Sequence, residues 1–293
     1  MSAVSLTATD SDEQTFSTII PSMGRLLAAR RMREAAKYPL SDEAAAVTPE
    51  GIAAAVQHLS GIRATPLLVG TDGVGHFAQI LGRLPVEVGA IVIAATDATL
   101  AREVRSILAE QSTRPVITEA DAEAISTLAA IVTYLNRTRG TPRGARVVIA
   151  GASRLPLLCA LLLTAGVFDI VMWEPRDDGP LSNLVRDADV VVNLMDDDEQ
   201  IVQISWDRPC GSVISPPPQA GVLPLPGLVR AISRAAAPVI NVAVCHACAV
   251  GMVNTTPASR LAPVLTEPRL AFEVAAQASR LLGPGNTENM PPP

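Results

Sequence analysis

A glycine that closes an apolar run, followed by a helix and then an acid, has the clearest chemical meaning in this sequence. One apolar run ends at Gly151, an apolar helix is expected over residues 155–164, and a second apolar run ends at Glu174. In such a strand–helix–strand unit the glycine allows a tight turn, and an acid about twenty residues later binds the adenine ribose of a dinucleotide. Residues 145–174 therefore predict a Rossmann-type βαβ unit in which Gly151 and Glu174 are cofactor-binding residues.

The glycine fingerprint of such a unit is incomplete here. Ser153 replaces the glycine that lets the backbone approach a pyrophosphate, and Pro156 replaces the glycine that packs the helix on the sheet. Proline is tolerated in a first helical turn, because its missing N–H would have no partner in the helix. Arg154 is a candidate phosphate ligand that would compensate. Two interpretations stay open: a dinucleotide site with Gly151, Ser153 and Arg154, or a Rossmann unit that has lost its ligand.

Residues further along bear on which cofactor would bind. Glu174 favours NAD, whereas Arg176 keeps NADP possible. Asn193, late in the next expected strand, is a candidate contact to the nicotinamide or its ribose. The acidic run over residues 196–199 is expected to be a solvated loop, and its charge would repel a pyrophosphate.

The elements that must position these residues form two lobes of an α/β fold. Residues 1–140 are expected to form a smaller N-terminal α/β lobe with a helical arm, residues 141–282 a Rossmann-type parallel-sheet lobe, and residues 283–293 a disordered tail. The first lobe begins with a loose arm over residues 1–20, and its expected helices span 22–37, 48–59, 100–110 and 119–137, with strands over 66–69, 90–95 and 115–117. The second has expected strands over 147–150, 169–173, 189–195, 212–215 and 238–244, and helices over 155–164, 225–236 and 258–282. Helix 22–37 is either an amphipathic surface helix or an oligomer arm.

Composition narrows the class of protein. Apolar residues make up 48% of the 293 residues but aromatic residues only 3%, which is typical of an Ala/Val/Leu core in an α/β fold. The net charge of −6 and the lack of a basic stripe argue against a nucleic-acid partner. The sequence has no apolar span long enough for a membrane helix and no secretory signal pattern. Four unevenly spaced cysteines suit a reducing compartment, so a cytoplasmic protein is expected.

Cys245, His246 and Cys248 form a C-x-x-C run directly after the expected strand over residues 238–244. The end of a strand is where α/β proteins bind ligands, so a reactive thiol or a partial metal site is one interpretation. A zinc site needs about four ligands, and no second Cys/His pair is present. The other interpretation is that these small residues pack in the interior.

The order of short motifs resembles that of the malic enzymes. The resemblance is collinear over residues 37–200, and each motif alone is short. It rests on Pro39-Leu40 before Val47 to Gly51, Thr71-Asp72-Gly73, Pro115 to Ala120, and Arg146 to Glu174. Methylene-tetrahydrofolate and shikimate dehydrogenases look similar around residues 143–166. The resemblance implies two lobes with a cleft between them, in which an NAD(P)-dependent oxidation takes place, and a homo-oligomer.

The departures from that family concern its catalytic residues. The family's tyrosine acid is replaced by Val47, and the segment that carries its lysine base looks deleted, since Lys37, the only lysine, lies upstream of the motif. The family's metal ligands would align near Asp97 and Ala120, and Glu119 and Asp121 flank the latter. Asp97, Glu119 and Asp121 are therefore candidate ligands for Mg²⁺. The competing interpretation is that Thr118 and Asp121 form a helix capping box.

Two functions follow from these observations. The first is a diverged NAD(P)-dependent oxidoreductase acting on a small acid or carbonyl substrate, with Asp72, Asp97 or His246 as a new acid or base. The second is a non-catalytic malic enzyme-like binding or scaffold subunit, because the family's tyrosine, its lysine and two fingerprint glycines are missing. A redox function of Cys245 and Cys248 is a third possibility.

Overall fold

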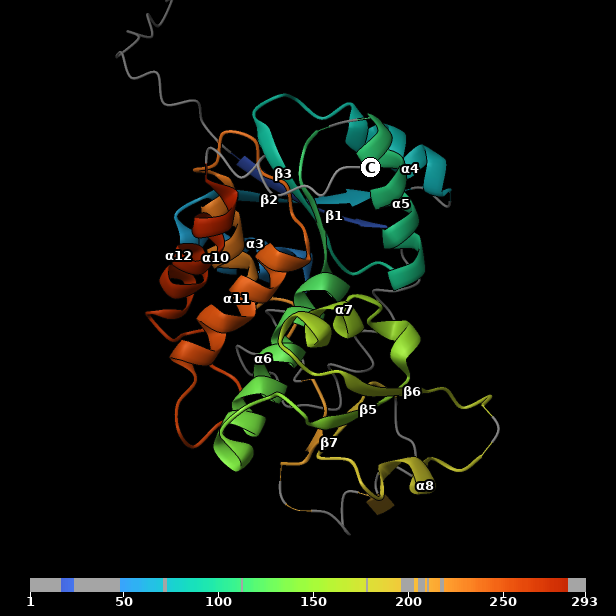
Figure 1. Cartoon of the computed structure of the whole chain (residues 1–293). Helices are drawn as coiled ribbons and strands as arrows, with labels where there is room; N and C mark the ends of the chain where they lie inside the picture. Colours follow the sequence, from blue (N-terminus) through green and yellow to red (C-terminus); the bar gives the residue numbers. More distant parts are fainter. Residues whose placement is uncertain are drawn as a thin grey trace, which may run out of the picture.

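The computed structural model describes residues 17–23, 48–70, 73–111, 113–177, 179–195, 203–204, 209, 211–216 and 219–283. Two four-stranded parallel sheets form the centres of two lobes (Figure 1). The first sheet has the strand order β2-β1-β3-β4 and the second the order β6-β5-β7-β8. This arrangement confirms the α/β class and the Rossmann-type sheet expected from the sequence.

The first sheet consists of β1 (Ser17–Met23), β2 (Arg63–Val69), β3 (Val88–Ile93) and β4 (Val116–Thr118). The expectation of a loose arm over residues 1–20 is wrong for its last four residues, since β1 lies between β2 and β3. Pro21 concealed this strand, because proline is rare in central strands. The ladder with β3 ends at the pair Ile19–Ile91, before the proline. Ser22 lies within β1, which ends at Met23, and therefore does not begin a helix.

The second sheet consists of β5 (Arg146–Ala150), β6 (Asp169–Trp173), β7 (Val190–Asn193) and β8 (Val213–Ile214). A fifth strand over residues 238–244 was wrongly expected. That apolar run leads instead into helix α11 (Val242–Thr255), and Asn241 caps it by accepting a hydrogen bond from the Val244 N–H at 3.0 Å. The expected helix 258–282 is also shorter, because α12 spans only Leu270–Leu282.

Helices α3 (Pro49–Ser60), α6 (Glu119–Arg139), α7 (Leu157–Thr164), α10 (Leu225–Ile232), α11 and α12 lie between the two sheets or beside them. Side chains alternate between the two faces of each strand, so the two faces of the second sheet line different parts of the core. Val147 and Ile149 of β5 belong to the large cluster shared by both lobes, whereas Val148 belongs to a smaller cluster beside α8 (Leu181–Val185). The outer face of the first sheet packs on α4 (Val74–Gly82), which the sequence did not predict, and α5 (Ala98–Gln111).

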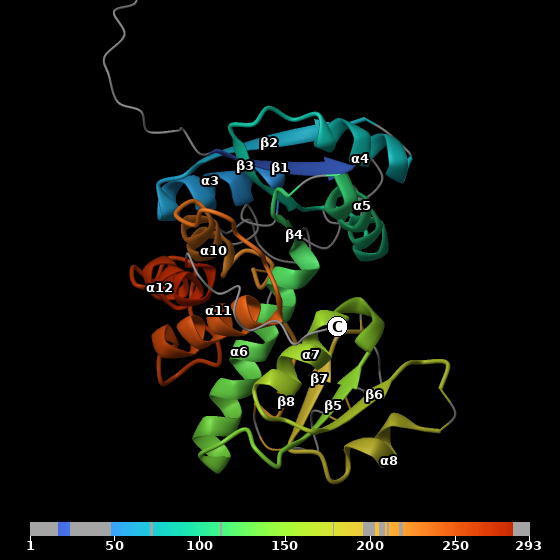
Figure 2. The ribbon, with the colours of Figure 1, turned by 45° about the horizontal axis from the view of Figure 1, so that its top comes forward.

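Figure 2 shows α6 running from the first sheet to the second; α11 packs against α6, and α12 packs against α10 and α11. Helix α10 contacts α3 of the first lobe, and α11 contacts both α6 and α7. Gly227 and Gly251 permit the close packing of α12, because a Cβ atom at either position would lie within 2.9 Å of Val274 atoms. The division of the chain at residue 140 stays a prediction.

Several expectations fall on residues outside the described ranges: most of helix 22–37 with Lys37, Asp72, the acidic run 196–199 and most of the tail from residue 283. In the helices that the structure does describe, none is both long and apolar enough to cross a bilayer.

Candidate functional site

Gly151 ends β5 in a conformation and at a place that only glycine suits. Its φ of +81° lies in the left-handed region. A Cβ atom here would approach the Met195 Cγ atom to 3.0 Å and the Leu194 carbonyl carbon to 3.3 Å. The turn after β5 therefore passes directly against the segment that follows β7, at the carboxyl edge of the second sheet. This edge is where open α/β sheets bind ligands.

Glu174 extends from the end of β6 to the turn that follows Gly151. Its Oε1 atom accepts a hydrogen bond of 2.7 Å from the backbone N–H of Ser153. The structure thus brings together Gly151, Ser153 and Glu174, which the sequence analysis had selected. Arg176 is exposed in the turn after β6.

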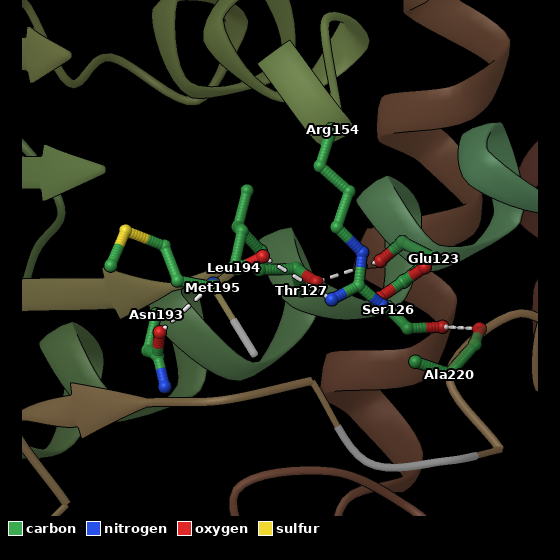
Figure 3. Close-up of polar contacts among 8 residues, drawn as sticks. All are labelled: Glu123, Ser126, Thr127, Arg154, Asn193, Leu194, Met195 and Ala220. Atoms are coloured by element: carbon green, nitrogen blue, oxygen red, sulfur yellow. Dashed lines mark hydrogen bonds and ion pairs between the residues drawn. The ribbon is translucent and has the colours of Figure 1, made fainter. Parts of the chain in front are cut away.

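Arg154 extends from this turn towards helix α6 (Figure 3). Its Nη2 atom lies 2.8 Å from Oε1 of Glu123 on α6, and its Nη1 atom donates to the Leu194 carbonyl oxygen at 3.3 Å. Glu123 was not selected from the sequence. It lies four residues after Glu119 on the same helix, and that spacing is the one local signal that could have marked it.

Asn193 fixes the conformation of the chain at the end of β7 through two hydrogen bonds. Its Oδ1 atom accepts from the Met195 N–H at 3.0 Å, and its Nδ2 atom donates to Ser215 Oγ at 3.3 Å. Asn193 therefore lies at the same sheet edge as Gly151, since Ala150 pairs with Asn193 in the β5–β7 ladder.

The backbone after Gly151 forms a 3₁₀ turn, η1 (Ala152–Arg154), before α7 begins. The N–H groups of Arg154 and Leu155 donate to the carbonyl oxygens of Gly151 and Ala152 at 3.1 and 3.2 Å. Pro156 precedes α7 and has no N–H. The turn therefore offers fewer free N–H groups to a phosphate than a complete glycine-rich turn would.

A second group of candidate residues lies at the carboxyl edge of the first sheet. Asp97 accepts hydrogen bonds from the N–H groups of Thr99 at 2.9 Å and Leu100 at 3.3 Å, so it caps α5. Glu119 accepts a hydrogen bond of 2.9 Å from the N–H of Ala95. Ala95 has a φ of +48°, which is strained for a residue other than glycine. Its contact with Glu119 fixes the peptide that follows β3.

Asp121 is also committed to its helix. It forms a reciprocal capping box with Thr118, with bonds of 3.0 and 3.1 Å, and an ion pair with Arg105 of α5. The capping interpretation of Thr118 and Asp121 is confirmed. In the described part of the chain no three His, Cys, Asp or Glu side chains are grouped as a metal site would require. Asp97, Glu119 and Asp121 therefore do not fit a shared divalent ion in this conformation.

The C-x-x-C run lies in the first turns of α11 and not at the end of a strand. Burial, together with the nearby Asp121 carboxylate, raises the pKa of Cys245 to about 12. Burial also raises the pKa of Cys248 well above its ordinary value. Both thiols are therefore protonated at neutral pH, as interior packing residues would be. Burial lowers the pKa of His246, which favours its neutral form.

A cavity of about 360 Å³ lies at the other end of the second sheet, near Asp189, which precedes β7. Arg139 and Arg186 line it at the carboxyl ends of α6 and α8, and Asp189 forms an ion pair with Arg139. Cations suit helix carboxyl ends. The cavity lies at the opposite end of the second sheet from the Gly151 turn.

No protein-family model matches the sequence, and no curated protein matches it by sequence. The fold nevertheless matches solved malic enzymes. The malic enzyme from Pyrococcus horikoshii matches with a TM-score of 0.72 and 16% identity, covering 94% of this chain and 79% of that one. The NAD-dependent malic enzyme from Thermotoga maritima matches at 0.71 and 14%, covering 91% and 85%.

The malic enzyme from Entamoeba histolytica matches with a TM-score of 0.69 and 18% identity, covering 92% of this chain and 70% of that one. The malic enzyme-like fold expected from the sequence motifs is therefore confirmed. Identities this low establish the fold alone.

Proposed function

We propose that this protein is a diverged NAD(P)-dependent oxidoreductase that acts on a small acid or carbonyl substrate. The observation that carries the proposal is the contact between Glu174 and the Gly151 turn at the carboxyl edge of the second sheet, in a malic enzyme-like fold. An acid in this place binds the adenine ribose hydroxyls in dinucleotide folds. Glu174 therefore favours NAD, while Arg176, two residues on, keeps NADP within the proposal.

The residues of the crevice have separate roles in this proposal. The bound nicotinamide would accept or deliver a hydride. Arg154 supplies a positive charge for the pyrophosphate, which the turn's backbone N–H groups only partly provide. Asn193 lies at the end of β7, where it would contact the nicotinamide or its ribose.

The acid or base of the reaction must differ from the tyrosine and lysine of malic enzymes. His246 is a candidate, because its neutral imidazole can accept a proton. Asp97 keeps one carboxylate oxygen, Oδ2, outside its capping bonds to Thr99 and Leu100. Asp72, the third candidate, lies outside the described residues. No divalent metal enters the proposed reaction.

A second candidate function, a non-catalytic binding or scaffold subunit, is favoured by specific contacts. The 3₁₀ turn after Gly151 satisfies two of its own N–H groups. Asp97 and Asp121 cap helices, and the thiols of Cys245 and Cys248 are held protonated. A chain that has lost its chemistry would keep such structural contacts.

Calorimetric titration of the purified protein with NADH and NADPH, with and without Mg²⁺, separates the two functions. The oxidoreductase proposal expects binding with a dissociation constant on the order of micromolar. Glu174→Ala should abolish NADH binding, while Arg176→Ala should weaken NADPH more than NADH. Absence of binding of both nucleotides up to about millimolar would overturn the proposal in favour of the non-catalytic subunit.

A further inference from the structure

The crevice at the edge of the second sheet contains charged partners for its own candidate ligand-binding groups. Figure 3 shows the Arg154 side chain lying between Leu194, which follows β7, and Glu123 on α6. The Glu174 carboxylate accepts the Ser153 N–H at 2.7 Å. The cation and a backbone donor that a pyrophosphate would use are therefore both bound to carboxylates of the same chain.

The ion pair between Arg154 and Glu123 joins a largely buried partner to a more exposed one. The side chain of Glu123 is only 16% exposed, whereas that of Arg154 is 46% exposed. Glu123 is therefore fixed within the helix layer, and the longer and more exposed arginine is the partner that can move. A phosphate of a dinucleotide and the carboxylate of Glu123 are both anions that a guanidinium binds through the same N–H groups.

Helix α6 connects this ion pair to the edge of the first sheet. Four residues before Glu123, Glu119 holds the N–H of Ala95, and three residues after it, Ser126 donates to the carbonyl oxygen of Ala220. Arg154 thus joins the turn after β5 to a helix that contacts elements of both lobes. A ligand that draws Arg154 away from Glu123 releases this contact between the turn and α6.

We infer that Glu123 competes with the pyrophosphate of the dinucleotide for Arg154, so that the Arg154–Glu123 ion pair is a latch that cofactor binding opens. The inference rests on the proposed function, since it concerns the affinity of the same crevice. It assigns Glu123, which matches no residue of the dinucleotide fingerprint, the role of setting that affinity. The latched state binds weakly, and removal of the Glu123 charge produces tighter binding.

A double-mutant cycle measured by NADH titration tests the latch. Glu123→Gln should lower the dissociation constant by about threefold to tenfold, in line with a partly exposed ion pair. Arg154→Ala should weaken binding, and Glu123→Gln should then have no further effect in the Arg154→Ala background. Glu273→Gln is the matched control, because Glu273 forms an ion pair with Arg269 on α12 and is 20% exposed. It should leave NADH affinity unchanged.

The outcomes separate the latch from the function on which it rests. If neither the natural chain nor any variant binds NADH, the proposed function is wrong, and the latch that rests on it is wrong as well. If NADH binds the natural chain and Glu123→Gln with equal affinity, the latch is wrong while the function stands. A gain from Glu123→Gln that persists without Arg154 also overturns the latch, because it would arise from direct repulsion between Glu123 and the phosphates. Thermal melting of each variant verifies that it is folded.

Discussion

The carboxyl edges of the two sheets hold similar residue types but use them differently. At the edge of the second sheet, Glu174 contacts Ser153 and Arg154 contacts Glu123, and each pair joins separate elements. At the edge of the first sheet, Asp97 accepts hydrogen bonds from the N–H groups of Thr99 and Leu100, and Asp121 accepts one from the N–H of Thr118. Each of these carboxylates therefore caps a helix.

Polar groups that join separate elements can exchange a protein partner for a ligand without unfolding a helix. Groups that cap a helix cannot do so without weakening it, because the N–H groups they satisfy lose their partner. The contacts of Glu174 and Arg154 at the second edge are therefore ones that a ligand can replace, as our proposal requires. The capping contacts of Asp97 and Asp121 at the first edge are structural.

Thiol labelling should show the largest difference between the two edges. Cys159 lies in α7, one helix beyond the Gly151 turn, and is half-buried, whereas Cys245 lies near Asp121 and Arg105. With a pKa of about 12, Cys245 has about a thousandfold less thiolate at pH 8.5 than an ordinary thiol. Iodoacetamide followed by peptide mass spectrometry should therefore label Cys159 well before Cys245 or Cys248. Rapid labelling of Cys245 in the folded protein would contradict this prediction and would indicate a reactive thiol near the first edge.

Gly151→Ala should cause the next largest effect, a loss of about 3 kcal/mol in the free energy of unfolding. About 1 kcal/mol of this loss comes from the left-handed backbone, and the rest from the Cβ contacts with Met195 and Leu194. Urea denaturation measures it. Gly144→Ala is the matched control, because Gly144 has a φ of +71° but no atom near a new Cβ. Equal losses at the two positions would mean that the turn after β5 is not packed against the end of β7.

Local signals made the second edge predictable. The apolar runs, the glycine with a positive φ and the acid after β6 all lie within thirty residues, and each is fixed by near neighbours. The run of residues 238–244 misled because its valines and isoleucine favour a strand, while Asn241 inside it favours a helix start.

Contacts between segments that are far apart in the sequence could not be predicted from local residue patterns. Strand β1 is defined by pairing with β2 and β3, more than forty residues away, and not by its own composition. The partners Glu123 for Arg154 and Glu119 for Ala95 depend on how α6 lies between the sheets. The spacing of Glu119 and Glu123 on α6 does not identify Ala95 or Arg154 as their partners.

Asp121→Ala should cost about 2 kcal/mol, because it removes one half of the capping box and the ion pair with Arg105. Asp121→Asn keeps an oxygen that can accept the Thr118 N–H and should cost about half as much. Both losses are measured by urea denaturation, once in EDTA and once in MgCl₂. A stabilisation by Mg²⁺ that the natural chain shows and Asp121→Ala lacks would contradict the structural role and restore a metal site at the first edge.

His246 should give the smallest effect, a change in the pH dependence of stability. Burial lowers the pKa of His246 in the folded protein below the unfolded value of 6.5. Below pH 6.5 the unfolded chain therefore binds more protons than the folded chain, so stability is full above pH 6.5 and falls as the pH decreases through the window down to the folded pKa.

His246→Gln removes the titrating group, and the slope of unfolding free energy between pH 6.5 and pH 5 should become flatter. His58→Gln, which removes an exposed histidine of α3, is the matched substitution for comparison. A steeper slope in the His246 variant would mean that the imidazolium is stabilised in the folded state. His246 would then face an anionic partner in the folded protein.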